Sequence, residues 1–114
     1  MPILSNFPGG AGSGSGGLTL AAVTGITTQV ASGKVYVKWT DPEDIIVSGA
    51  ALATWGGTLL VRKAVSTPTN RRDGTIVLDS KTRNAYSETY FCDSSLANGT
   101  TYYYKLFPYT TDKA

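Results

Sequence analysis

Residues 96–104 read Leu-Ala-Asn-Gly-Thr-Thr-Tyr-Tyr-Tyr, which places a turn directly before a strand. The Asn-Gly pair favours the turn, and the Thr and Tyr side chains favour the pleated surface that follows. Side chains alternate between the two faces of a strand. This alternation predicts that Tyr102, Tyr104 and Leu106 point inward, and that Tyr103, Lys105, Phe107 and Tyr109 lie on the outer face.

Further strands are predicted on the N-terminal side of this segment. Residues 34–39 read Lys-Val-Tyr-Val-Lys-Trp, a period-two pattern typical of a half-buried strand. The same reasoning gives strands at residues 18–30, 34–39, 58–63, 75–79, 89–92 and 101–109. Several short strands separated by turns indicate an all-β fold, a two-sheet antiparallel sandwich.

The composition of the chain changes at residue 18. The first charged residue is Lys34, and glycine and serine crowd residues 9–17. We therefore expect residues 1–17 to form an extended apolar peptide followed by a Gly/Ser-rich linker, and residues 18–114 to form one domain.

The first residues contain Ile3, Leu4 and Phe7, which have no core of their own to enter within residues 1–17. One interpretation is a loose leader, because chain termini are often untethered. The other is a docking peptide whose three apolar side chains bind a partner. In that case the flexible linker lets the following domain move relative to the partner.

Charge and residue usage exclude several classes of function. A net charge of +2 is too weak for a nucleic-acid interface, and no apolar run is long enough for membrane insertion. With no His and one Cys, most Ser-His, Cys-His and zinc-ligand sets are excluded. We expect no enzyme activity, no cofactor and no metal, since the acids at 41, 43 and 44 lack the spacing of a calcium loop and are common turn residues.

Two segments carry a resemblance to a known family. Residues 96–102 resemble the L-x-x-G-x-x-Y signature before the sixth strand of fibronectin type III domains, and residues 35–42, Val-Tyr-Val-Lys-Trp-Thr-Asp-Pro, are similar to the second strand of that family. The resemblance covers residues 18 to about 112. It implies that Trp39 is buried, Leu96 caps the core, Gly99 permits the turn, and the Tyr102 hydroxyl bonds back to nearby backbone.

One feature departs from the family pattern. A seventh strand should follow residue 110, but only four residues remain. The expectation is a sandwich that lacks its last strand, with either a longer natural chain or a strand donated by a neighbouring subunit at the open edge.

The amino-acid sequences of the two segments resemble those of modules encoded in bacterial and prophage genomes, which occur in tail, baseplate and fibre proteins. The resemblance implies a non-enzymatic structural or adhesion component of a phage virion, contacting other virion proteins and a host glycan as a symmetric homo-oligomer. The alternative is a spacer or carbohydrate-contacting module of a bacterial surface or secreted protein.

Several side chains are candidates for partner contact. The stripe of Tyr103, Phe107 and Tyr109 suits protein contact or sugar stacking, unless it packs against cross-strand neighbours. A basic rim of Arg71, Arg72 and Arg83 would suit an anionic glycan or an acidic partner, or be a solvated turn. Trp55 is either an exposed anchor or a plug at the end of the sandwich, and Cys92 is expected to be an inert, at least half-buried thiol.

Overall fold

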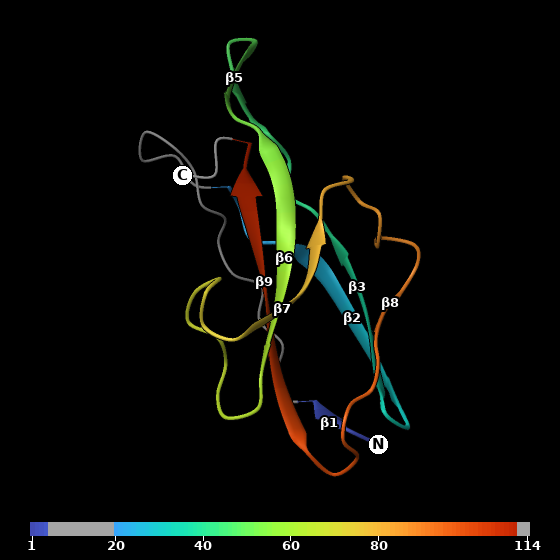
Figure 1. The fold of residues 1–114 in the computed structure, drawn as a ribbon. Coiled ribbons are helices and arrows are strands. Elements are labelled where there is room, and N and C mark those ends of the chain that lie inside the picture. Colours follow the sequence, from blue (N-terminus) through green and yellow to red (C-terminus); the bar gives the residue numbers. More distant parts are fainter. Residues whose placement is uncertain (5–19, 112–114) are drawn as a thin grey trace.

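The computed structural model describes residues 1–4 and 20–111, and every regular element in these residues is a β-strand (Figure 1). The strands are β1 (Ile3–Leu4), β2 (Thr24–Ala31), β3 (Lys34–Thr40), β4 (Ile45–Val47), β5 (Ala50–Ala53), β6 (Trp55–Lys63), β7 (Thr75–Ser80), β8 (Phe91–Asp93) and β9 (Thr101–Thr110).

All six predicted strands are confirmed, with shifted ends. The largest shift is at the start, where the strand expected from residue 18 begins at Thr24. Leu20 and Val23 precede β2 and are buried, so this segment contributes side chains to the core without pairing in a sheet.

The strands form two main sheets that pack face to face. One sheet has the order β2-β3-β8 and the other β1-β9-β6-β7, and all pairings except β1 with β9 are antiparallel. Two layers of antiparallel strands around one core confirm the all-β prediction and are consistent with a sandwich.

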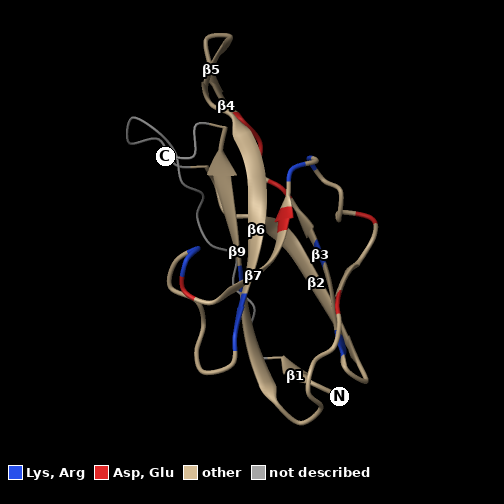
Figure 2. Cartoon of the chain, viewed as in Figure 1, with Lys and Arg blue, Asp and Glu red and all other residues tan. Residues whose placement is uncertain are grey.

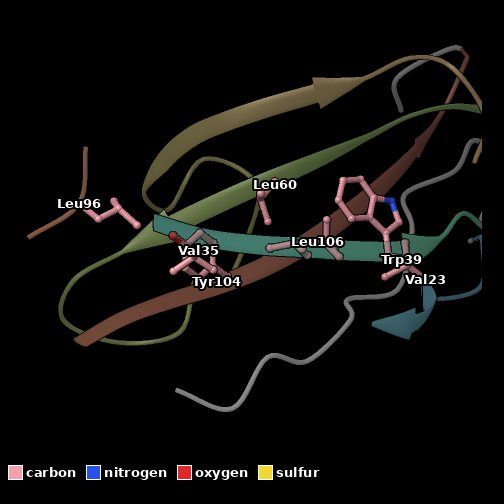
Figure 3. Packing of buried hydrophobic residues seen from close by; sticks show 8 residues of the cluster. Val23, Val35, Trp39, Leu60, Leu96, Tyr104 and Leu106 are labelled. Atoms are coloured by element: carbon pink, nitrogen blue, oxygen red, sulfur yellow. The ribbon is translucent and has the colours of Figure 1, made fainter. Parts of the chain in front are cut away.

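The core lies between the two sheets (Figure 3). The predicted inward face of β3 is confirmed, since Val35, Val37 and Trp39 are all buried. Leu60 of β6 and Leu106 of β9 oppose each other in register and pack into the same cluster. The cluster comprises Val23, Val35, Val37, Trp39, Leu60, Leu96, Tyr104 and Leu106.

The turn before β9 has the local geometry that its sequence predicts. Leu96 is buried in the core cluster, and Gly99 has a φ of 80°, a conformation that favours glycine. The hydroxyl of Tyr102 accepts a hydrogen bond from the backbone N–H of Ala97 at 2.9 Å, and its half-buried ring packs against the core. This hydrogen bond fixes the entry of the chain into β9.

The first residues of the chain pack on the domain itself. β1 pairs in parallel with the start of β9, with Ile3 opposite Thr101 (Figure 1). The Gly99 N–H also donates to the Met1 carbonyl at 3.0 Å. Leu4 packs against the core of the domain, a placement that neither the loose-leader nor the docking-peptide interpretation expected, whereas Ile3 is 49% exposed.

We therefore expect Leu4→Ala to lower the free energy of unfolding by about 1–2 kcal/mol, because it removes a partly buried aliphatic side chain. The matched change Ile3→Ala should stay within about 0.5 kcal/mol, because that side chain faces solvent. Urea unfolding followed by tryptophan fluorescence measures both, and equal losses in the two variants would contradict the placement of β1.

Candidate functional site

The outer face of the β9-β6-β7 sheet contains the predicted aromatic stripe. Alternation along β9 is confirmed, since Tyr104 and Leu106 belong to the main core and Phe107 and Tyr109 to a separate cluster on the other face. Tyr109 is only 4% exposed, and Tyr103 and Phe107 are half-buried. The stripe is therefore largely packed, as the cross-strand alternative expected.

Tyr109 is held by two neighbouring strands. Its ring lies across Gly57, the residue opposite it on β6, where an added Cβ would come within 2.3 Å of the hydroxyl oxygen. The hydroxyl donates to Asp79 Oδ1 of β7 at 2.6 Å. Burial and this hydrogen bond raise the pKa of Tyr109 to about 12.

A pocket of about 250 Å³ opens beside Tyr109. Three strands and the β6–β7 connection build it. Its lining residues are Leu59, Arg71, Arg72, Ile76, Asp79 and Tyr109. The pocket thus combines an apolar floor with two guanidinium groups and one carboxylate, and it brings together two of the three arginines of the predicted basic rim.

The β6–β7 connection that carries Arg71 and Arg72 is fixed by Asp73. Its carboxylate accepts hydrogen bonds from Lys63 Nζ at 2.8 Å, and from the backbone N–H and the hydroxyl of Thr69 at 2.9 and 3.0 Å. The hydrogen bonds from Lys63 and Thr69 lower the pKa of Asp73 to about 2. These hydrogen bonds to Asp73 therefore hold the loop in place at the residue that directly follows Arg72.

A second candidate surface is the β4–β5 hairpin, which projects from one end of the sandwich (Figure 1). The sequence predicts no strand between residues 39 and 58, so both strands of the hairpin are a new finding. Ser48 and Gly49 at its turn both have positive φ, as the tight turns of twisted hairpins require. The charge-free run from residue 45 to 61 was a signal that could have drawn attention to it.

The hairpin is apolar and exposed. Ile46 is 61% exposed, and Val47 and Leu52 are also exposed. The hairpin is tan throughout in Figure 2, with acidic residues only at its base. Several exposed aliphatic side chains on one projecting element are typical of a surface that contacts another macromolecule.

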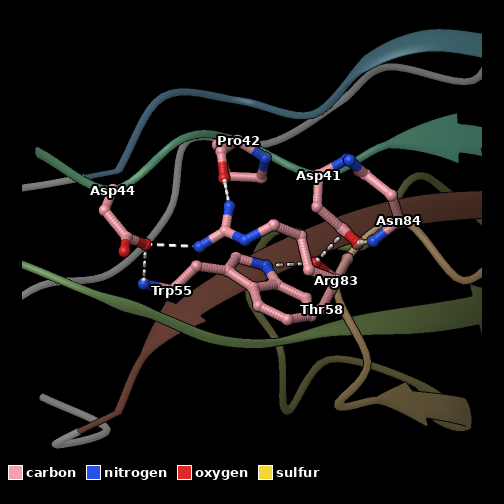
Figure 4. A network of polar contacts seen from close by, with 7 residues as sticks. All are labelled: Asp41, Pro42, Asp44, Trp55, Thr58, Arg83 and Asn84. Carbon is pink, nitrogen blue, oxygen red and sulfur yellow. Dashed lines mark hydrogen bonds and ion pairs between the residues drawn. The ribbon is translucent and has the colours of Figure 1, made fainter.

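Two acids at the base of the hairpin, Asp41 and Asp44, take part in an internal polar network (Figure 4). Asp41 is buried, and its Oδ1 accepts from Trp39 Nε1 at 2.9 Å and from the Thr58 hydroxyl at 2.7 Å. Its Oδ2 accepts from the Asn84 backbone N–H at 2.7 Å, while the Asn84 side chain accepts from the Asp41 N–H. No group of three potential metal ligands occurs within residues 1–4 and 20–111.

Trp55 and Arg83 extend this network toward the hairpin. The Trp55 indole N–H donates to the Thr58 hydroxyl at 2.9 Å, and the ring is buried against Leu20. Arg83 lies over that ring, 5.1 Å from its centroid, and donates to Asp44 and to the Pro42 carbonyl. Trp55 therefore closes the end of the sandwich. Arg83 binds groups at this end, whereas the other two arginines of the predicted rim line the pocket.

A second buried carboxylate joins the two sheets at the opposite end of the core. Asp93 of β8 accepts two hydrogen bonds from Arg62 Nη1 of β6, at 2.9 and 2.8 Å. The Tyr104 hydroxyl of β9 also donates to it at 2.5 Å. Burial and this hydrogen bond raise the pKa of Tyr104 well above its ordinary value.

Cys92 is exposed, so the expectation of an at least half-buried thiol is wrong. Phe7 and the Gly/Ser-rich linker lie outside the described residues. Within the described ranges the structure has no helix that could span a bilayer.

Comparisons with protein-family models, with curated proteins and with solved structures find no match to this chain.

The Asp41 network gives a stability prediction. Asp41→Ala should lower the free energy of unfolding by about 3 kcal/mol, because it leaves the buried Trp39 and Thr58 donors, and the Asn84 backbone N–H, without their acceptor. Glu43→Gln is the matched control, since Glu43 is exposed in the same loop and should change stability by less than about 0.5 kcal/mol. Urea unfolding compares the two, and a mild Asp41→Ala effect would contradict the network.

Tyr109 gives an alkaline prediction. Its pKa in the folded protein, about 12, lies above the ordinary value of 10.0, so folding favours the protonated phenol. This contribution to stability is complete below pH 10 and is lost as the pH rises toward 12. The free energy of unfolding should therefore fall less steeply over this range in Tyr109→Phe than in the wild type. Identical slopes in denaturant titrations would refute this assignment.

Proposed function

We propose that this chain is a non-enzymatic structural and adhesion component of a phage virion, displaying a fibronectin type III-like sandwich. The observation that carries the contact function is the β4–β5 hairpin, an exposed apolar ribbon held clear of the sandwich. The resemblance of residues 35–42 and 96–104 to modules of tail and fibre proteins supports the virion as its setting.

The internal use of charged side chains also supports a contact role. Asp41, Asp93 and Arg62 are committed to hydrogen bonds inside the fold, and Arg83 is committed to Asp44. These groups stabilise a rigid scaffold. A rigid scaffold with a protruding apolar element suits repeated contacts in an assembly, where many weak contacts add up.

The hairpin is the proposed contact with other virion proteins. Burial of two aliphatic side chains such as Ile46 and Leu52 at an interface contributes about 2–4 kcal/mol. The chain would then assemble in symmetric copies with the rest of the particle. Ile3 lies on β1, at the edge of the β1-β9-β6-β7 sheet, where it is 49% exposed and available for a further contact.

A carbohydrate-contacting module of a bacterial surface protein is the second candidate function. The observation that favours it is the pocket on the outer face of the β9-β6-β7 sheet, which places arginine and carboxylate groups over an apolar floor. Sugar sites combine such polar groups with apolar surface. The two candidate functions predict different locations for the chain, the virion in the first case and the bacterial surface in the second.

The test is peptide mass spectrometry of purified particles from cultures that express tagged forms of the chain. We expect the wild type in the particles and an at least tenfold lower incorporation of the double variant Ile46→Ser/Leu52→Ser, given about 1.4 kcal/mol per tenfold. Val65→Ser is the matched control, because Val65 is 80% exposed but lies outside the hairpin. Recovery of the wild type from the cell envelope and not from particles would favour the bacterial surface module instead.

A further inference from the structure

We infer that the pocket beside Tyr109 binds one carboxylated sugar residue, such as a uronic acid within a host-surface polysaccharide. The inference rests on the proposed adhesion function and names its ligand. The size of the pocket, its floor, its charges and the bracing of the loop that carries the arginines all favour such a ligand.

The size and floor of the pocket suit a single sugar ring. Its volume of about 250 Å³ lies just below the range of sites for drug-sized ligands. Ile76 is 52% exposed and supplies most of the accessible apolar surface, beside Leu59 and Tyr109, which are 8% and 4% exposed. The C–H face of a pyranose can pack on such a surface while its hydroxyls meet polar groups at the edge.

The two arginines select for a carboxylate. Guanidinium groups present planar sets of N–H donors that match the two oxygens of a carboxylate. Arg72 is exposed, and Arg71 lies close enough to Tyr109 for its charge to oppose the rise in the pKa of that phenol. Both guanidiniums therefore belong to one small region of positive charge.

The carboxylate of Asp79 explains why a sugar fits better than a simple anion. Asp79 accepts from the Tyr109 hydroxyl at 2.6 Å, and Lys81 Nζ lies 3.8 Å from its other oxygen. An ionised carboxylate accepts about four hydrogen bonds, so it can also accept from ligand hydroxyls. A multiply charged phosphate would be repelled by Asp79, whereas a ligand with one carboxylate and several hydroxyls satisfies both kinds of group.

The loop with the arginines is organised before any ligand arrives. Asp73 binds Lys63 and Thr69, and the Asn70 side chain accepts from the Arg72 backbone N–H at 2.8 Å. Gly74 has a φ of 135°, and an added Cβ there would lie 2.6 Å from the Arg62 carbonyl oxygen. Preorganisation of this kind reduces the entropy lost on binding.

The experiment is an NMR titration of the full ¹⁵N-labelled chain with methyl β-D-glucuronide and methyl β-D-glucoside. The two probes share the pyranose ring and the methyl aglycone. They differ only at C6, which is a carboxylate in the glucuronide and a hydroxymethyl group in the glucoside. We expect millimolar binding of the glucuronide, with shifts at the amides of Arg72, Ile76, Asp79 and Tyr109, and about tenfold weaker binding of the glucoside.

Two variants localise the site. Arg72→Gln should weaken glucuronide binding about tenfold, because it removes one charge-assisted contact. Lys34→Gln removes the same charge from an exposed position on the other sheet and should leave the binding unchanged. Unchanged amide spectra outside the pocket would show that both variants remain folded.

Several outcomes would overturn the inference. These are equal binding of glucuronide and glucoside, equal weakening by both variants, or absence of shifts in the pocket. If inorganic phosphate or a triglutamate peptide shifts the same amides as strongly, the pocket is a general anion site and the sugar assignment fails. The titration needs no particles, so its result is independent of whether the chain is found in virions.

Discussion

The buried carboxylate of Asp41 is the interaction on which the rest of the structure depends. It accepts from Trp39 of one sheet and Thr58 of the other, and it also accepts from the backbone of Asn84 in the connection after β7. Trp55 reaches the same group through Thr58. Burial of a carboxylate is costly unless its lone pairs are satisfied, and here at least three donors from separate segments converge on it. The two sheets, the end plug and one long loop are thereby held in a single arrangement.

A second carboxylate repeats this arrangement at the other end of the core. Asp93 joins β8 of one sheet to Arg62 and Tyr104 of the other. Burial would lower the pKa of Arg62, but its hydrogen bonds and charge interaction with Asp93 outweigh this effect and raise it. Each end of the apolar core is thus closed by polar groups that find their partners across the sheets. Such networks favour one packing of the sheets over sliding alternatives.

The sequence predicted the strands well because their signal is local. Period-two alternation in residues 34–39 and 101–109 fixes which face is buried, whatever the rest of the chain does. The Tyr102 turn was also predictable, since its hydrogen bond spans only five residues. The position of β1 and the hairpin were not predictable in this way. Pairing of Ile3 with Thr101 joins residues far apart in sequence. In the hairpin, only the three residues of β4 favour a strand, and the alanines of its partner β5 do not.

In the candidate site, too, local features could be predicted from the sequence and contacts between distant residues could not. The face of Tyr109 followed from alternation, but its burial depends on Gly57 across the ladder, and no local pattern reveals that contact. The three arginines of the predicted rim illustrate the same limit. They are close in sequence, yet Arg83 is drawn to Asp44 and Trp55 while Arg71 and Arg72 reach the pocket beside Asp79. The positive charge that the three side chains share does not indicate which of them line the pocket. Asp44 holds Arg83 at the base of the hairpin, whereas Asp73, through its ion pair with Lys63, braces the loop that carries Arg71 and Arg72, so two ion pairs outside the pocket separate the three arginines.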